Sequence, residues 1–398
     1  MFAPSADGAG GSSTGGSSTG GGVNTAPCLG LLPLGTVLSP KDLPSSGQDD
    51  LLQVTPTSDD GRRITAVFAR KDAAGTFALR HTTLRPWDDW PQDSALGPMH
   101  APGIESISRF EVGRSGASEW AAVVRAVAGP RLIRGLAAEQ GGTPPAQIPL
   151  PGIEPVFVSR RLTGPEAHLV GTFDVMAKGQ VVRATFVDAA GTPTELEPLG
   201  CANGQPLRAA AVPFQDHWLV AISRSPLAAG CETSSSGAPT ELTVLEVNPG
   251  GPHAALVGFS TGDTIIDVHA APHPAGLYAV WSRSVVTGAR VFAARVERNT
   301  GLTVGPVEIV AASAGNTSFT AGAVGDKLAV AQRDGPNLVV SIWDESLTKT
   351  AEATLVSGNS MSPTALYGPP DGEGVVATWS ENVGGQYRVY MARLDCVP

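Results

Sequence analysis

Residues 276–310, GLYAVWSRSVVTGARVFAARVERNTGLTVGPVEIV, contain three short segments that look like consecutive β-strands. They are LYAVWSR (277–283), ARVFAARVE (289–297) and TVGPVEIV (303–310). Each is rich in β-branched or aromatic residues, and glycine-containing breaks separate them, which is the pattern of antiparallel strands joined by turns. This stretch therefore predicts an antiparallel sheet.

The first of these segments recurs along the whole chain. Its seven copies are ITAVFAR (64–70), WAAVVR (120–125), HLVGTFD (168–174), WLVAISR (218–224), LYAVWSR (277–283), LAVAQR (328–333) and VVATWSE (375–381). Neighbouring copies end 48 to 59 residues apart, as from 333 to 381 and from 224 to 283. Such a period, with strand patterns and almost no helical pattern, predicts an all-β, seven-bladed β-propeller with four-stranded antiparallel blades. We call the strands of a blade A, B, C and D from the inside outward, the repeated segment being strand B. Because strand A is weakly marked in the first two units, six or eight blades remain alternatives.

The two ends of the chain complement each other. The last unit stops after strand C, at QYRVYMARLD (386–395), whereas GLLPLGTVL (30–38) resembles the D strands of other units. We expect residues 30–38 to complete the last blade and close the ring, because an open ring would leave unpaired strand edges. The expected domains are a Gly/Ser/Thr-rich tether over residues 1–27 and a single propeller domain over residues 28–398.

The four cysteines, at positions 28, 201, 231 and 396, form no CxxC pair. In the repeat map Cys28 and Cys396 fall on adjacent strands of the closing blade. Cys201 and Cys231 fall in a D–A and a B–C connection, which emerge on the same face of a propeller. The map therefore predicts bridges Cys28–Cys396 and Cys201–Cys231, and two bridges indicate an oxidising compartment. The alternative is four free, buried thiols.

Composition limits the possible partners and location. The 398 residues carry a net charge of −10, which argues against nucleic-acid binding, and no run of eighteen apolar residues could span a membrane. The tether cannot bury enough surface to order, and it resembles the spacer after the lipidated cysteine of bacterial surface lipoproteins. We expect an extracytoplasmic monomer (cell surface, periplasm or secreted) whose native precursor carries an export signal and has room for a lipid anchor. The alternative is a cytoplasmic protein with a disordered tail.

Two segments resemble known propeller repeats. TSDDGRRITAVFAR (57–70) is similar to the repeat of TolB-type propellers, where a polar Asp-Gly turn precedes an apolar strand. LYAVWSRSVVTGARVFAARVE (277–297) resembles the repeats of secreted bacterial propellers, whose B strand ends in an apolar-Trp-polar signature. Both families include periplasmic scaffolds and surface proteins, so the resemblance implies binding more readily than catalysis.

Arginine recurs at the end of strand B. The seven equivalent positions are Arg70, Arg125, Asp174, Arg224, Arg283, Arg333 and Glu381. Because these positions lie where the B–C and D–A connections emerge, the five arginines predict a broken cationic ring suited to carboxylate, sulfate or phosphate groups. The alternative is that each arginine bonds loop carbonyls or an acid on the neighbouring blade, and recurs because the blade recurs.

Four further features are weaker candidates. The insertion Ser225–Thr240 lies on the same expected face, where recognition loops concentrate. Trp281 and Trp379 share a strand face with Arg283 and Glu381, two positions on; Trp281 could stack on Arg283, or such tryptophans could simply pack between blades. The loop Pro86–Asp93, with two tryptophans and three acids on the opposite face, could bind a sugar or a cation, or could cover a blade edge. His269 and His273 have a metal-like spacing, but Pro272 and Pro274 exclude the helix that it requires.

Together these features favour a binding or scaffold propeller that recognises a protein or glycan partner, or an anionic ligand, through the B–C/D–A face. A hydrolase or lyase acting on polysaccharide is the alternative, and a purely structural surface protein is a third reading. No Ser-His-Asp arrangement, phosphate loop or metal-ligand cluster is recognisable, so we expect no cofactor, no metal and, more readily than not, no enzyme activity.

Overall fold

The computed structural model describes residues 28–33, 51–56, 64–71, 77–84, 87, 99–104, 110–115, 119–126, 128–136, 147–176, 179–202, 207–225, 238–285, 288–301, 303–313, 318–357, 361–369, 371–383 and 386–397. Every helix or strand element found within these ranges is a β-strand. The same ranges contain no helix that is long and apolar enough to cross a membrane.

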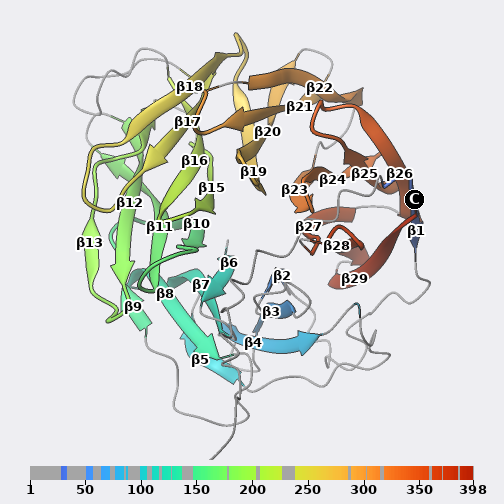
Figure 1. The fold of residues 1–398 in the computed structure, drawn as a ribbon. Coiled ribbons are helices and arrows are strands. Elements are labelled where there is room, and N and C mark those ends of the chain that lie inside the picture. Colours follow the sequence, from blue (N-terminus) through green and yellow to red (C-terminus); the bar gives the residue numbers. More distant parts are fainter. Residues whose placement is uncertain are drawn as a thin grey trace, which may run out of the picture.

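The described strands form seven antiparallel sheets arranged around a centre (Figure 1). The first three sheets contain β2 (Leu51–Pro56), β3 (Ile64–Lys71), β4 (Phe77–Leu84) and β5 (Met99–Ile104); β6 (Phe110–Ser115), β7 (Glu119–Ala126), β8 (Gly129–Leu136) and β9 (Gln147–Pro149); and β10 (Glu154–Arg160), β11 (Ala167–Met176), β12 (Gly179–Asp188), β13 (Pro193–Glu195) and β14 (Gly200–Ala202). The next two contain β15 (Ala209–Phe214), β16 (His217–Arg224), β17 (Glu241–Val247) and β18 (Ala254–Ser260); and β19 (Ile265–His273), β20 (Gly276–Val285), β21 (Gly288–Glu297) and β22 (Thr303–Ser313). The last two contain β23 (Phe319–Val324), β24 (Lys327–Asp334), β25 (Asn337–Trp343) and β26 (Lys349–Ser357); and β27 (Met361–Tyr367), β28 (Gly374–Val383), β29 (Gln386–Val397) and β1 (Gly30–Pro33).

Each predicted repeat segment lies in the second strand of a sheet, that is, in β3, β7, β11, β16, β20, β24 and β28. In β7, β11, β16, β20, β24 and β28 several consecutive residues are buried, so both faces of these strands are covered. In β16, HWLVAISR, seven consecutive residues are buried and only the terminal Arg224 is partly exposed. A strand with only one covered face would instead alternate apolar and polar residues.

The hydrophobic core is divided into layers between neighbouring sheets. One layer joins the third and fourth sheets, where Trp218 lies 6.1 Å from Phe186 and its indole N–H donates to the Ser159 carbonyl oxygen at 3.0 Å. The next layer joins the fourth and fifth sheets, where the buried Trp281 is stacked between Phe259 and Phe292 with ring centroids 5.6 and 6.0 Å away. Packing between blades therefore accounts for Trp281.

Trp379 is also buried and stacks on Tyr390 of its own sheet at 5.5 Å. Both tryptophans therefore pack within the core, and the guanidinium of Arg283 lies over Phe292 instead of Trp281.

The innermost strands contact one another in a continuous series. β2 contacts β6, which contacts β10, and the series continues through β15, β19, β23 and β27. β27 in turn contacts β2, so each of these strands has a neighbour on both sides. Figure 1 shows the same strands surrounding the centre of the molecule.

The segment that precedes the first sheet joins the last one. β1 pairs antiparallel with β29, with Leu31 opposite Cys396, and a disulfide joins Cys28 to Cys396 across a Cα–Cα distance of 5.0 Å. In Figure 1 β1 lies beside the C-terminus. The strand covers Gly30–Pro33, and residues 34–38 of the predicted closing strand lie outside the described residues.

Two short strands form the outer edge of the third sheet, where the repeat predicts a single D strand. β12 pairs with β13 through Thr185–Val187 and with β14 through Gln180–Val182. Pro198, which lies between the two strands, lacks the N–H that an uninterrupted ladder needs, which accounts for the division. Cys201 consequently lies in β14 rather than in a D–A connection. It is disulfide-bonded, and its predicted partner, Cys231, lies outside the described residues.

Hydrogen bonds between neighbouring sheets define two faces of the molecule. On the face that carries the B–C and D–A connections, which we call the B–C face, Arg125 of β7 pairs with Glu154 of β10. On the opposite face, which we call the A–B face, Arg298 follows β21 and donates Nε–H and Nη2–H to the two carboxylate oxygens of Glu246 in β17, each at 2.9 Å. Adjacent sheets therefore present their B–C connections on one face and their A–B connections on the other.

Removing the terminal disulfide is expected to lower stability strongly. The bond spans a sequence separation of 368 residues, so it restricts nearly the whole unfolded chain, an effect of about 6 kcal/mol in the entropic description. In Cys28→Ser/Cys396→Ser the guanidinium unfolding midpoint, followed by tryptophan fluorescence, should fall well below that of the wild type. Deleting residues 1–26 keeps the bond and serves as the control. Equal midpoints for all three proteins would contradict the prediction.

The Glu246–Arg298 pair predicts a pH-dependent contribution to stability. Hydrogen bonding from Arg298 holds the pKa of Glu246 below its ordinary value of 4.5, although partial burial opposes the shift. The pair therefore stabilises the fold above pH 4.5 and loses this effect as the pH falls through the lowered pKa. Glu246→Gln should cost about 1 kcal/mol at pH 7, because Arg298 is partly exposed, and less near pH 3.

Urea unfolding at the two pH values measures this difference. The matched control is Glu352→Gln, which removes a carboxylate from the exposed Lys349–Glu352 pair and should change stability by less than about 0.5 kcal/mol at either pH. A Glu246→Gln effect that is the same at both pH values would show that the charge of Glu246 is not responsible.

Candidate functional site

The described arginines of the predicted set lie at the B–C face. Arg125 is the penultimate residue of β7, Arg224 is the last residue of β16, and Arg283 and Arg333 lie near the ends of β20 and β24. Arg70 has the equivalent position in β3, but its side chain lies outside the described residues. The repeat thus places these arginines at corresponding ends of separate sheets.

Carboxylates hold two of these guanidinium groups. Arg125 Nη1–H donates to Glu154 Oε1 at 2.9 Å, which links the second sheet to the third. Arg224 donates from Nε and Nη2 to Glu241 Oε1, at 2.9 and 2.6 Å, across the strands β16 and β17. Both arginines therefore have a fixed orientation.

Backbone carbonyls hold the other two. Arg283 Nη1–H donates to the Thr261 oxygen at 2.7 Å, and its guanidinium lies 3.9 Å from the centre of the Phe292 ring rather than on Trp281. Arg333 Nε–H donates to the Gly335 oxygen at 3.0 Å. All four described arginines thus bond a carbonyl or an acid of the protein, as the alternative to ligand binding expects.

These contacts leave part of each group open to solvent. The side chains of Arg125, Arg224 and Arg283 are 39%, 32% and 24% exposed. A guanidinium has five N–H donors, and the bonds described use only one or two of them. Ligand binding by the arginines remains a prediction, which the intramolecular bonds neither require nor exclude.

The acidic members of the repeated position differ from the arginines. Asp174 in β11 accepts a hydrogen bond from Arg183 Nε at 2.7 Å, and this bond raises the pKa of the Arg183 guanidinium further. Arg183 also bonds Glu195. Glu381 in β28 lies opposite Arg388 in the strand register. The B–C face is thus a surface of mixed charge.

The weaker sequence candidates are dispersed. Within the loop 86–93 only Trp87 is described, and it contacts Tyr367 of β27 at 6.3 Å and Arg393 of β29 at 5.9 Å, so it packs on the last sheet. His269 lies 3.4 Å from Asp267, whereas His273 bonds Glu345, so the two histidines have different partners. Residues 226–237 of the predicted insertion lie outside the described residues.

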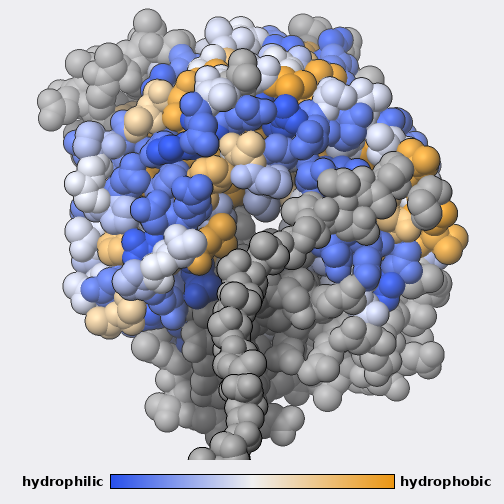
Figure 2. Space-filling view, viewed as in Figure 1, coloured by the Kyte–Doolittle hydropathy of each residue, from blue (hydrophilic) through white to orange (hydrophobic). Residues whose placement is uncertain are grey.

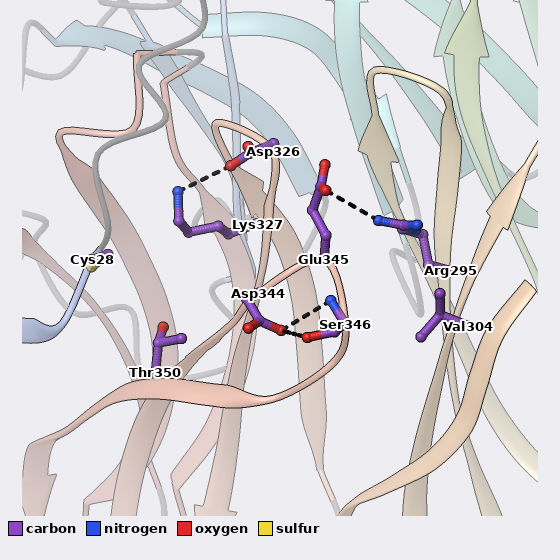
Figure 3. A pocket seen from close by; sticks show the side chains of 9 residues that line it. All are labelled: Cys28, Arg295, Val304, Asp326, Lys327, Asp344, Glu345, Ser346 and Thr350. Atoms are coloured by element: carbon purple, nitrogen blue, oxygen red, sulfur yellow. Dashed lines mark hydrogen bonds and ion pairs between the residues drawn. The ribbon is translucent and has the colours of Figure 1, made fainter.

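A pocket on the A–B face was not predicted. It has a volume of about 540 Å³ and lies over the end of the sixth sheet (Figure 3). Its lining comes from the fifth, sixth and last sheets and consists of Cys28, Arg295, Val304, Asp326, Lys327, Asp344, Glu345, Ser346 and Thr350. These residues come from three different sheets, and the comparison of single repeats did not reveal them.

Two ion pairs and a turn organise this pocket. Lys327 Nζ lies 3.0 Å from Asp326 Oδ1, and Arg295 Nη1 lies 3.3 Å from Glu345 Oε2 (Figure 3). Asp344 Oδ1 accepts hydrogen bonds from the backbone N–H of Ser346 at 3.0 Å and of Thr348 at 2.8 Å. Partial burial opposes ionisation of Asp344, but these bonds prevail and lower its pKa.

Buried groups behind the pocket fix its walls. His273 accepts the Ala275 N–H at Nδ1, at 3.2 Å, so its hydrogen is on Nε2, which donates to Glu345 Oε1 at 3.1 Å. The Tyr278 hydroxyl donates to the Asp326 carbonyl oxygen at 2.6 Å, and burial raises the pKa of this phenol. The side chain of Glu345 and the turn at Asp326 are both held from behind.

No group of three or more His, Cys, Asp or Glu side chains that could hold a metal ion is found among the described residues. Figure 2 shows that hydrophilic side chains predominate on the described part of the visible surface. Apolar side chains gather at the margin where Figure 1 places β1, in agreement with the exposure of Leu29, Leu32 and Val397.

Comparison with known proteins supports the fold. No protein-family model and no curated protein matches the sequence. Among solved structures, the chain is similar to the Dos1 propeller, with 12% identity and a TM-score of 0.50 over 90% of this chain and 95% of that one.

Two further solved structures are less similar. An uncomplexed acylaminoacyl peptidase from Pyrococcus horikoshii has 8% identity and a TM-score of 0.49 over 88% of this chain, which spans only 52% of the peptidase. The β-propeller domain of the Trilobed protease from Pyrococcus furiosus has 8% identity and a TM-score of 0.48 over 88% of this chain and 98% of that one. The sheets described above and the likeness to the Dos1 propeller together identify the fold as an all-β propeller.

Proposed function

We propose that this protein is an extracytoplasmic binding scaffold that recognises an acidic protein, an anionic glycan or another anionic ligand through its B–C face. The observation that carries the proposal is the set of oriented, partly exposed arginines at equivalent strand ends, Arg125, Arg224, Arg283 and Arg333. Pre-oriented guanidinium groups lose little freedom on binding, and their remaining donors suit carboxylate, sulfate or phosphate oxygens.

The proposed scaffold is a seven-bladed ring closed by β1, within a single propeller domain of residues 28–398. The pairing of β1 with β29, the Cys28–Cys396 disulfide and the contact of β2 with β27 support this arrangement. The packing of Trp87 against Tyr367 and Arg393 supports it as well, because it ties the first unit to the last.

The proposed location is outside the cytoplasm. The bond between Cys28 and Cys396 supports it, as does the oxidised state of Cys201, because disulfides persist mainly in oxidising compartments. A tether at residues 1–27 would hold a monomeric, TolB-like bacterial propeller near a membrane or cell wall.

Binding is favoured over the alternative of a polysaccharide hydrolase or lyase. A general acid working near neutral pH needs a raised carboxyl pKa. The described carboxyl groups with a resolved shift, Asp216, Glu246 and Asp344, have a lowered pKa, which suits ion pairing and capping rather than proton donation.

The proposal predicts retention on an anionic matrix despite the net charge of −10. The wild type should bind immobilised heparin and poly-glutamate at low salt. Arg125→Gln/Arg224→Gln should weaken binding to at least one of them about tenfold or more, because it removes two oriented charged donors. Biolayer interferometry over a salt series measures the change.

The control is Arg161→Gln/Lys349→Gln, which removes the same charge from connections on the A–B face. Equal losses in the two double variants would show that only net charge matters, and would remove the B–C face from consideration. A wild type that binds neither matrix at low salt would overturn anionic recognition.

A further inference from the structure

The pocket on the A–B face is a second candidate binding site that does not depend on the arginines. Its volume of about 540 Å³ lies within the range of about 300–1,000 Å³ usual for small-molecule sites. Figure 3 shows the Asp326–Lys327 pair and the Glu345–Arg295 pair on either side of the turn at Asp344 and Ser346. Cys28 and Thr350 lie at one end of this row, and Arg295 and Val304 lie at the other.

The charges of the lining nearly cancel. Three carboxylates, Asp326, Asp344 and Glu345, face two cations, Arg295 and Lys327. Lys327 and Arg295 pair with Asp326 and Glu345, and the N–H groups of the turn satisfy one oxygen of Asp344. A strongly charged ligand would have to displace one of these partners, so neither an anion nor a cation is favoured.

The lining nevertheless retains both acceptors and donors. A carboxylate can accept about four hydrogen bonds, and an ammonium group can donate three. Within the described residues, the turn's bonds to Asp344 all go to Oδ1 and leave Oδ2 aside, and the one hydrogen bond of Lys327 Nζ goes to Asp326. The buried Nε–H of Arg295 has no acceptor among the described residues. The pocket therefore offers adjacent charged donors and acceptors within a nearly neutral site.

One exposed carboxylate of the lining is also rigidly held. The Glu345 side chain is 52% exposed, but Arg295 bonds one of its oxygens and the buried His273 bonds the other. Because these partners fix the carboxylate before a ligand arrives, little ordering remains to oppose binding. Its unused lone pairs are directed by the protein rather than by solvent.

We propose that this pocket binds a neutral saccharide unit. The vicinal hydroxyls of a sugar donate to carboxylates and accept from ammonium or guanidinium groups, so they match a lining in which both kinds of group lie side by side. Val304 provides a small apolar contact for the C–H groups of the ring. The pocket and the B–C face then form two independent binding surfaces at opposite ends of the propeller.

Saturation-transfer NMR of the intact protein with methyl glycosides of glucose, galactose, mannose, fucose and N-acetylglucosamine tests the proposal. At least one should receive saturation, and titration then gives its affinity. Glu345→Gln should weaken that affinity about tenfold, since it converts charge-assisted hydrogen bonds into neutral ones. Ser346→Trp, which fills the pocket mouth but keeps the backbone bond to Asp344, should abolish binding.

Glu352→Gln on β26 is the matched control and should bind like the wild type, and circular dichroism checks the fold of each variant. If Glu345→Gln is unstable, Ser346→Trp alone decides. Absence of transfer to every glycoside would overturn the proposal. The proposal would also fail if binding survived in Ser346→Trp, or if free lysine or glutamate bound in place of the sugars. None of these outcomes bears on the B–C face, because binding to immobilised heparin and poly-glutamate tests that face separately.

Discussion

Burial of each sheet on both faces is the constraint on which the structure depends. A four-stranded sheet whose second and third strands are apolar on both sides cannot stand alone in water, and it gains stability only between two neighbours. The core layers between the third and fourth sheets and between the fourth and fifth illustrate this dependence. The stability of one sheet therefore depends on the next, and a sheet without a neighbour would expose one of these layers.

The ion pairs have a different part in the structure. Arg125–Glu154 on the B–C face and Glu246–Arg298 on the A–B face both join adjacent sheets, but they are partly exposed and add little free energy compared with the aromatic layers. Their geometry sets how neighbouring sheets align at their ends. The same pairs leave guanidinium and carboxylate groups with fixed directions around both rims, which is a useful property for a binding surface.

The sequence predicted the strands well where burial dominates, because a strand covered on both sides leaves a long apolar signature. LYAVWSR and WLVAISR identified β20 and β16. The missing last strand pointed to residues 30–38, of which Gly30–Pro33 pair with β29 and the rest lie outside the described residues. The division of the outer strand into β13 and β14 was missed, because an exposed edge strand has no strong pattern. The predicted pairing of Cys201 with Cys231 stays a prediction.

The candidate sites were predictable to different degrees. Arginines at one repeated position are visible by aligning the units, but whether they bond Glu154, Thr261 or solvent depends on connections whose geometry the repeat does not encode. The pocket around Glu345 was not visible in the sequence because residues from three sheets build it. Repetition reveals what the blades share, whereas a single pocket depends on what one of them does differently.

The disulfide between Cys28 and Cys396 also has a mechanical consequence. The two ends of the folded chain are joined by a covalent bond across 5.0 Å between Cα atoms. A pulling force applied between the segment before Cys28 and the C-terminus would therefore pass through that bond instead of through the hydrogen bonds of the sheets. A protein loaded in this direction would keep its fold up to the strength of a covalent link, whereas the reduced protein could unravel strand by strand from β1.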